Sequence, residues 1–184
     1  MEIKMIGLDL DGTALNDSGE FSKRTRQAFK RAHEHGIHVV IATGRAEFSL
    51  PQNIAEIEGL EYVITSNGAR VLRLSDGSVV YKNFIKPHKV REVIEVLKSQ
   101  NARAEMFANG KAYISRSEYD AIVSGDILTR SKGYVIATRN PIDDIFTHMI
   151  DWEDHIENIS VNYPNDKAKR ACEKKLAEIE GITV

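Results

Sequence analysis

The sequence predicts an α/β protein, with a parallel sheet in its first part and an α+β unit in its second. Between residues 1 and 83, near-continuous apolar runs of strand length alternate with segments of helical period. This pattern is typical of parallel βαβ units whose sheet is covered on both faces. From residue 84 onward, helices alternate with hairpins and long connections, which favours an α+β unit. A length of 184 residues suffices for one large or two small domains.

The first strand and helix follow from periodicity and capping residues. Residues 3–10 form an apolar run that predicts a buried strand. Residues 22–36 have a helical pattern that starts at Ser22, a good N-cap residue, and ends at Gly36. The expected apolar stripe of this helix consists of Ala28, Phe29 and Ala32.

The rest of the first unit continues the alternation. Residues 46–59 predict a second helix, which Pro51 weakens and Gly59 ends. Strands are expected at residues 37–43 and 61–66, and a hairpin around Asp76-Gly77 at residues 69–83.

The second unit begins with a clear amphipathic helix at residues 86–100, with Pro87 near its start. Residues 103–116 predict a hairpin that turns at Asn109-Gly110, and the polar stretch 126–140 has no clear period. The stripe of the first helix is Val90, Val93, Ile94 and Leu97, and the remaining expected elements are helices at 117–125, 141–150 and 165–181, a strand at 156–163 and the start of another at 182–184.

Composition excludes several classes of partner. The 25 basic and 27 acidic residues nearly balance, and no basic stripe carries interleaved aromatic residues, so we expect no nucleic-acid partner. No apolar run approaches the roughly 18 residues of a membrane span, so we expect no membrane association. The single cysteine, Cys172, excludes a disulfide within the chain and suits a reducing, cytoplasmic location.

Two carboxylates stand at the end of the first predicted strand. Asp is a poor strand residue and is costly to bury, yet the apolar run ends in Asp9 and Asp11. If the strand continues through Asp11, its period of two points both side chains to one face. A bound cation would then relieve their repulsion. The alternative is an Asx-turn in which one aspartate only caps the loop.

Polar groups also follow the second and third predicted strands. Thr43 to Arg45, with the sequence TGR, stands at the end of one strand, and Thr65 to Gly68, with the sequence TSNG, at the end of the next. The carboxyl ends of parallel strands meet at one edge of the sheet, where free backbone N–H groups favour an anion. Together with the two aspartates, these turns predict a site for a phosphate and a divalent metal.

These motifs have the order of a known family. The sequence LDLDGTALN, followed by IATGR and SNGA, resembles the haloacid dehalogenase-like (HAD) superfamily, in particular its Cof-type sugar-phosphate phosphatase branch. The resemblance implies a Rossmann-like parallel-sheet core, present here in part, with an inserted α+β cap domain. It implies that residues 1–83 are the N-terminal part of the core and residues 84–184 the cap.

The resemblance also implies a mechanism and its residues. Asp9 is expected to attack phosphorus and form an aspartyl-phosphate, while Asp11 protonates the leaving group and later activates water. Mg²⁺ is expected on the Asp9 carboxylate and the Asp11 backbone carbonyl. The expected phosphate- and substrate-binding residues are Leu10, Gly12, Thr13, Thr43, Gly44, Arg45 and Asn67; Gly12 allows the sharp turn, Thr13 orients the Asp11 carboxylate, and Arg45 and Asn67 have a helix-start or turn role as the alternative.

The chain departs from the family in one respect. Cof-type members continue after the cap with a lysine and a Gly-Asp-x-x-Asn-Asp loop. No such loop occurs in this sequence, and its last lysines lie on an expected solvated helix face of the cap, namely Lys167, Lys169, Lys174 and Lys175. The end of the cap and the rest of the core are therefore expected to be missing, which leaves residues 3–10 as an open edge strand. We expect one of three situations: a longer natural chain, which we favour, a truncated gene, or self-association through the uncovered first strand.

The sequence thus supports two main hypotheses. One is an Mg²⁺-dependent phosphatase that hydrolyses small phosphorylated metabolites, with sugar phosphates as the expected substrates. The other is a truncated HAD-like fragment that binds phosphate without turnover. Transfer of the phosphoryl group to a sugar, as in a phosphomutase, is a third option.

Overall fold

In the computed structural model, residues 2–127 and 132–184 are described, and the chain divides into two compact units. Unit 1 comprises residues 1–83 and unit 2 residues 84–184. Within the described ranges, no helix is long and apolar enough to cross a membrane.

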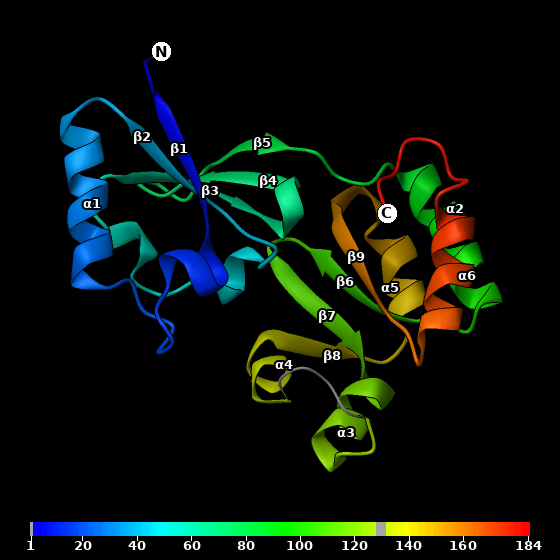
Figure 1. The fold of residues 1–184 in the computed structure, drawn as a ribbon. Helices are drawn as coiled ribbons and strands as arrows, with labels where there is room; N and C mark the ends of the chain where they lie inside the picture. The colour runs from blue at the N-terminus through cyan, green and yellow to red at the C-terminus, as the bar shows by residue number, and fades with distance from the viewer. Residues whose placement is uncertain (1, 128–131) are drawn as a thin grey trace. The chain divides into compact units, whose positions relative to one another are not determined.

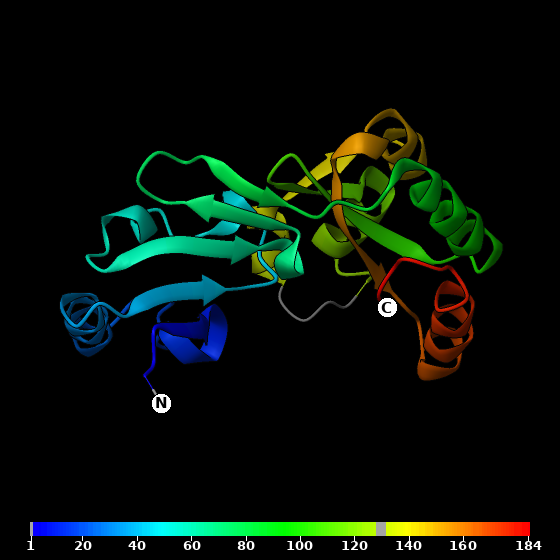
Figure 2. The ribbon, with the colours of Figure 1, turned by 90° about the horizontal axis from the view of Figure 1, so that it is seen from above.

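Unit 1 is built on a five-stranded sheet in the order β1-β2-β3-β4-β5 (Figure 1). The strands β1, β2 and β3 run parallel to one another, and β4 and β5 extend the sheet as an antiparallel hairpin. Figure 2 shows β1, in dark blue, at one edge of this sheet. The prediction of parallel strands followed by a hairpin is confirmed. The strand bounds are Met5–Asp9 (β1), His38–Ala42 (β2), Leu60–Thr65 (β3), Arg70–Arg73 (β4) and Val79–Lys82 (β5).

Helix α1 (Lys23–Glu34) begins as the sequence predicts. The Ser22 hydroxyl accepts a hydrogen bond from the Thr25 backbone N–H at 3.1 Å and so caps the helix. Phe29 is buried in the unit 1 core, where its ring meets that of Phe21 edge-on. The prediction that Ala28 belongs to the apolar stripe is wrong: it is exposed, because it lies one residue, about 100° of helix rotation, away from Phe29.

The predicted helix at residues 46–59 is also wrong. The segment contains two short 3₁₀ turns, η2 (Glu47–Ser49) and η3 (Ile54–Glu56). Leu50, directly before Pro51, is extended with φ −69° and ψ 152°, because the proline ring disfavours a helical conformation in the residue before it. Pro51 therefore ends the helical pattern instead of weakening it.

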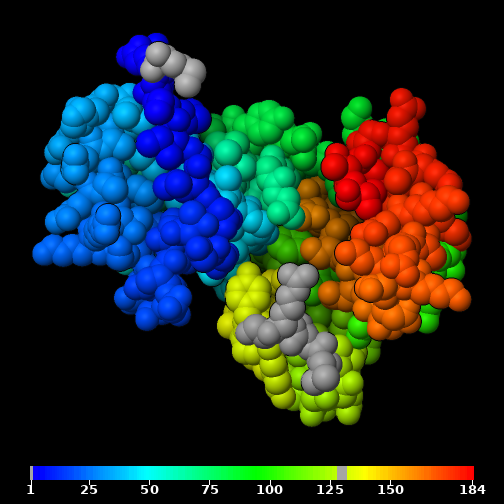
Figure 3. All heavy atoms as spheres, viewed as in Figure 1, coloured from blue at the N-terminus to red at the C-terminus, as the bar shows by residue number. Residues whose placement is uncertain are grey.

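Strand β1 pairs on one side only. It lies at the edge of the unit 1 sheet and hydrogen-bonds to β2, and the side chains of Ile3 and Met5 are 58% and 61% exposed. The N-terminal residues, dark blue in Figure 3, lie at the surface. The open first edge is confirmed for the described residues, and self-association through it stays a prediction.

Unit 2 contains a four-stranded sheet in the order β8-β7-β6-β9. The predicted hairpin at Asn109-Gly110 forms from β6 and β7, and both turn residues have positive φ. The elements of unit 2 are α2 (Pro87–Ser99), β6 (Arg103–Ala108), β7 (Lys111–Ser115), α3 (Arg116–Ser124), α4 (Lys132–Thr138), β8 (Arg139–Ile142), α5 (Ile145–Asp151), η5 (Glu153–His155), β9 (Ile156–Asn162) and α6 (Asp166–Leu176).

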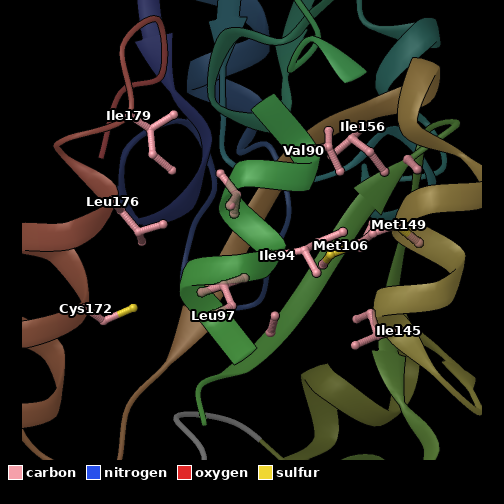
Figure 4. Close-up of a cluster of buried hydrophobic side chains, with 13 residues drawn as sticks. Val90, Ile94, Leu97, Met106, Ile145, Met149, Ile156, Cys172, Leu176 and Ile179 are labelled. Carbon is pink, nitrogen blue, oxygen red and sulfur yellow. The ribbon is translucent and has the colours of Figure 1, made fainter. Parts of the chain in front are cut away.

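One face of the unit 2 sheet is apolar. Met106 on β6 belongs to one buried cluster with apolar side chains of α2, α5 and α6 (Figure 4). Cys172 on α6 is buried in this cluster. The predicted stripe of α2 is confirmed, since Val90, Val93, Ile94 and Leu97 are all buried.

The opposite face of this sheet carries buried charges. Arg139 on β8 donates from Nε to Glu105 on β6 at 2.6 Å, and its guanidinium lies over the rings of Phe107 and Tyr134. The Nδ2 of Asn162 donates to the second oxygen of Glu105 at 3.1 Å. These contacts satisfy the Glu105 carboxylate, which burial alone would make costly.

Four expectations for unit 2 need correction or restriction. The segment 141–150 is not one helix, because residues up to Ile142 pair with β7 as β8 and Asp144 then caps α5. Residues 182–184 form no strand, since no strand in the described ranges pairs with them. Helix α6 ends at Leu176. In the stretch 126–140, residues 128–131 lie outside the described residues.

Gly59 should be more sensitive to substitution than an ordinary turn glycine. Its φ is +87°, and a Cβ there would lie 2.5 Å from the Phe29 carbonyl oxygen of α1. We expect Gly59→Ala to lower the free energy of unfolding by about 2–4 kcal/mol, measured by urea denaturation. Gly77→Ala is the control, since Gly77 has φ +68° but open space around it, and about 1 kcal/mol is expected there. Equal losses of unfolding free energy in the two variants would contradict the close contact between Gly59 and the Phe29 carbonyl.

Glu118 gives unit 2 a pH-dependent stability. Burial raises the pKa of Glu118 above its ordinary value of 4.5, Arg103 opposes this shift, and Glu105 adds to it. A carboxyl with a raised folded-state pKa opposes folding as pH rises above its ordinary value. The stability of Glu118→Gln relative to the wild type should therefore increase as pH rises from about 4, measured by urea denaturation at several pH values.

Asp144→Asn is the control, and its stability relative to the wild type should change with pH in the opposite direction. The Thr147 hydroxyl donates to the Asp144 carboxylate and lowers its pKa below the ordinary value. The Asp144 contribution is therefore present above that value and lost as pH falls. If the difference in unfolding free energy between Glu118→Gln and the wild type did not change with pH, the burial of the Glu118 carboxylate would be contradicted.

Candidate functional site

The carboxyl ends of β1 and β2 bring two of the predicted motifs together in unit 1. Asp9, the last residue of β1, is the register partner of Ala42, the last residue of β2. Thr43 follows directly, and its backbone N–H donates to the Ile64 carbonyl of β3 at 2.9 Å. The loops that follow the three parallel strands therefore start at the same edge of the sheet, as the sequence predicts.

Asp9 offers an exposed carboxylate at this edge. In the described part of the chain, no side chain or backbone group is bonded to that carboxylate. A carboxylate without a partner at a strand end remains available to a ligand, a metal ion or an electrophile.

Asp11 is placed by a turn and not by the strand. Strand β1 ends at Asp9, and residues Leu10–Ala14 form the tight turn η1, in which Gly12 has φ +71°. Of the two possibilities for Asp11, the strand that continues through it does not form, because the chain turns at Leu10, whose side chain is fully buried in the core. The turn is closed by the Leu15 N–H, which donates to the Leu10 carbonyl at 3.0 Å.

Arg45 binds Asp11 with both arms of its guanidinium. Nε donates to Asp11 Oδ2 at 3.0 Å and Nη2 donates to Asp11 Oδ1 at 2.6 Å. The third nitrogen, Nη1, donates to the Ser49 carbonyl at 2.8 Å. This planar, two-pronged pairing is geometry that arginine provides and lysine does not. Arg45 thus joins the loop after β1 to the loop after β2.

Thr43, Gly44 and Asn67 connect the second loop to the third. The buried Thr43 hydroxyl accepts a hydrogen bond from the Arg45 backbone N–H at 3.2 Å, and the Thr43 carbonyl accepts one from the Asn67 N–H at 3.3 Å. Gly44 lies so close that an added Cβ would stand 2.7 Å from Asn67 Oδ1. That oxygen is the end of a side chain that can rotate, so the bond from the Asn67 N–H to the Thr43 carbonyl, and not this approach alone, joins the two loops.

Thr13 shows no contact with Asp11. Its side chain is exposed, and no hydrogen bond within the described residues joins its hydroxyl to the Asp11 carboxylate. The expected orienting role of Thr13 is not formed in this structure, and Arg45 orients Asp11 in its place.

The donor atoms at this edge suit a hard cation. The unpaired Asp9 carboxylate and the peptide carbonyls of the η1 turn are oxygen donors, which Mg²⁺ prefers. Magnesium usually takes one or two protein carboxylates and completes its shell with water and phosphate oxygens. Among residues 2–127 and 132–184, no group of three His, Cys, Asp or Glu side chains forms a metal cluster. Asp9 therefore fits an Mg²⁺ site to which these residues contribute one free carboxylate.

Two contacts of the site were not expected from the sequence. Glu47 in η2 pairs with Arg70 on β4 at 3.2 Å, and the Ser49 carbonyl receives Arg45. A backbone carbonyl carries no sequence signal, and the Glu47–Arg70 pair joins positions 23 residues apart in sequence. The only indication in the sequence was that Glu47, an acidic residue, lies two positions after the TGR motif.

Comparison with known proteins establishes the family. The model of the haloacid dehalogenase-like hydrolase family matches residues 6–183. The chain therefore belongs to this family, which confirms the resemblance.

Individual relatives cover the chain to different extents. Phosphatase YwpJ of Bacillus subtilis is 34% identical over 112 residues, 60% of this chain and 39% of that protein. The 5-amino-6-(5-phospho-D-ribitylamino)uracil phosphatase YcsE of the same organism is 35% identical over 71 residues, 39% of this chain and 28% of that protein. The aligned region thus spans less than half of these relatives.

The fold is shared with solved structures. A haloacid dehalogenase-like hydrolase from B. subtilis matches with a TM-score of 0.72 at 23% identity, covering 98% of this chain and 69% of the other. This match confirms the predicted HAD-like fold class.

The Arg45–Asp11 pair should stabilise unit 1 more than an ordinary surface ion pair. Arg45→Lys keeps the charge but loses the two-pronged geometry and the bond to Ser49. We expect it to cost about 1 kcal/mol of unfolding free energy, a small value because the Asp11 side chain is 56% exposed. Urea denaturation followed on amide signals of unit 1 measures this.

Arg73→Lys is the matched control. Arg73 pairs with Asp76 through one nitrogen, three residues along the chain, and both side chains are exposed. We expect almost no loss for this variant. If the two variants lost equal stability, the two-pronged pairing of Arg45 would have no special role.

Proposed function

We propose that the protein is a phosphatase that hydrolyses small phosphate monoesters with Mg²⁺. The observation that carries this proposal is the unpaired Asp9 carboxylate beside an Asp11 that Arg45 holds in place. One carboxylate is free to react and its neighbour is oriented, which is the division of roles that a nucleophile and an acid–base group need. Family membership supports the same chemistry.

In the first step, an Asp9 oxygen attacks phosphorus and the bond from phosphorus to the ester oxygen breaks. The leaving oxygen takes a proton from the Asp11 carboxyl group and departs as an alcohol. In the second step, water attacks the aspartyl-phosphate, Asp11 takes the proton of that water, and the bond from phosphorus to Asp9 breaks to release inorganic phosphate. A bound Mg²⁺ supplies charge neutralisation of the phosphate oxygens.

The ionised and protonated forms of the Asp11 carboxyl group are proposed to occupy different positions, because the Arg45 guanidinium favours the ionised form. The guanidinium binds the ionised carboxylate, which is the form that accepts a proton from water in the second step. To donate a proton in the first step, the protonated Asp11 carboxyl group must loosen its bonds to Arg45 and direct its O–H to the leaving oxygen. Asp11 is more than half exposed, so this movement meets little steric hindrance.

The phosphoryl oxygens would be held by the loop after β2. The Gly44 N–H and the Thr43 hydroxyl are the candidate donors, supported by the N–H groups of the η1 turn. The buried Thr43 hydroxyl accepts from the Arg45 N–H, so its own proton remains available for a phosphate oxygen. Gly12, Thr13 and Asn67 are proposed to line the substrate side of the site.

The proposed substrates are small phosphorylated metabolites such as sugar phosphates. One relative, YcsE, bears the name of a phosphatase for a phosphorylated ribityl-pyrimidine, so the range extends to phosphorylated sugar alcohols that carry a ring. Unit 2 is proposed to be the cap that selects among leaving groups, and unit 1 to be the catalytic core.

A second candidate function is phosphate binding without turnover. It is favoured by one observation: the described residues offer no cluster of three metal-ligating side chains. A site with a single free carboxylate would hold Mg²⁺ and phosphate weakly and stabilise the transition state less.

Hydrolysis of p-nitrophenyl phosphate, with and without Mg²⁺, separates the two functions. We expect Mg²⁺-dependent turnover that Asp9→Asn reduces at least about a thousandfold. Asp17→Asn, an exposed aspartate of the same N-terminal segment, should retain full activity. Binding of inorganic phosphate without any turnover would support the second candidate. If the protein neither binds nor hydrolyses phosphate compounds, both functions are wrong.

A further inference from the structure

A large apolar side chain stands exposed next to the candidate site. Phe48 lies in the middle of η2, three residues after Arg45, and is 58% exposed. The other large apolar side chains that are exposed in the described part of unit 1 lie on or before its edge strands β1 and β5, namely Ile3, Met5, Val80 and Tyr81. Their exposure follows from the open sheet edges, whereas that of Phe48 does not.

The turn that carries Phe48 is fixed on both sides. The Ser49 N–H and hydroxyl donate to the Ala46 carbonyl at 3.0 and 2.9 Å, and the Leu50 N–H donates to the Glu47 carbonyl at 3.1 Å. Ala46 is buried and Leu50 packs against the unit 1 core. A short turn with this many internal bonds holds its central residue in one place.

Two charged contacts tie the same turn to the rest of unit 1. Glu47 pairs with Arg70, whose side chain is 11% exposed, and Ser49 accepts the Nη1 bond of Arg45 at 2.8 Å. Phe48 lies between these two anchored residues. Its backbone position is therefore set by contacts on either side, which lowers the entropic cost of using its ring to bind a ligand.

The position of Phe48 relative to the chemistry follows from Arg45. A single guanidinium bonds both the Asp11 carboxylate and the carbonyl of Ser49, the residue next to Phe48. One planar group thus separates Asp11, the proposed proton donor to the leaving oxygen, from the backbone that carries the exposed ring. The exposed ring of Phe48 is therefore the candidate apolar contact for a group attached to that leaving oxygen.

We propose that Phe48 is a specificity-determining residue that favours phosphate compounds whose organic part carries an aromatic or heterocyclic ring over those with a small polar or aliphatic part. This inference rests on the proposed function, because it assigns the leaving-group side of the same site. An aromatic ring offers a flat apolar surface on which another ring stacks or meets it edge-on. The preference expected from one such contact is roughly three- to tenfold.

Binding of two non-hydrolysable phosphonates tests the inference independently of turnover. Phenylphosphonate and methylphosphonate share the phosphonate group and differ in the ring. We expect the wild-type chain with Mg²⁺ to bind phenylphosphonate roughly three- to tenfold more tightly, as measured by NMR titration. Phe48→Ala should abolish this preference by weakening phenylphosphonate binding, with methylphosphonate binding unchanged.

Two further variants separate the ring of Phe48 from apolar surface in general and from exposed aromatic rings elsewhere. Phe48→Leu keeps an apolar side chain without a ring and should retain part of the preference. Tyr81→Ala removes an exposed aromatic ring from β5, which is 54% exposed and at the opposite sheet edge from β1, and should keep the whole preference. Urea denaturation of Phe48→Ala should match the wild type, because an exposed ring contributes little to the core.

The outcomes separate this inference from the proposed function. Equal affinity of the wild type for both phosphonates, or a preference that survives Phe48→Ala, would overturn the role of Phe48 and leave the phosphate site intact. Failure to bind either phosphonate would contradict the proposed function and this inference with it. Loss of methylphosphonate binding in Phe48→Ala would show that Phe48 supports the site as a whole and does not select substrates.

Discussion

The candidate site depends on the pairing of Arg45 with Asp11. Two charge-assisted hydrogen bonds, at 2.6 and 3.0 Å, join the loop after β1 to the loop after β2. The same guanidinium reaches the Ser49 carbonyl and so fixes the turn beyond it. Because Arg45 uses the Asp11 carboxylate, Asp9 is the carboxylate that remains open to a ligand. A single side chain therefore gives different contacts to two acidic residues that lie two positions apart.

The two units place their polar groups in different ways. In unit 1 the polar groups lie in loops at the carboxyl edge of a parallel sheet, where their backbone groups are exposed to ligands. In unit 2, charged residues lie buried on one face of the sheet, where Glu105, Arg139 and Asn162 satisfy one another. Buried charges that satisfy one another add specificity to packing. The exposed carboxylate of Asp9 makes no such contact and is available to a ligand.

The sequence predicted most of the elements, because their signals are local. Ser22 caps α1 and the Asn109-Gly110 turn forms, as their residue types require. The prediction of a helix at residues 46–59 was wrong because Pro51 disfavours a helical conformation in Leu50. The periodicity of apolar residues contains no information about this effect. The prediction that Ala28 is buried was wrong because alanine is small enough to occur on both buried and exposed helix faces.

The site was predictable in its residues and not in its contacts. The motifs located Asp9, Asp11, Thr43 and Arg45 at one sheet edge, and the structure brings the loops that carry them together. Which carboxylate Arg45 would bind was not predictable, because strand period and turn geometry gave conflicting directions for Asp11. The exposed ring of Phe48 gave no signal at all, since an apolar residue in a helical pattern indicates core.

The most direct test of these roles is a titration with Mg²⁺ followed on the side-chain carboxylate carbons by ¹³C NMR. We expect the Asp9 carboxylate signal to shift on addition of Mg²⁺ and the Asp11 carboxylate signal to stay in place, because Arg45 already binds Asp11. A shift of the Asp11 signal with no change at Asp9 would contradict the assignment of roles to the two aspartates.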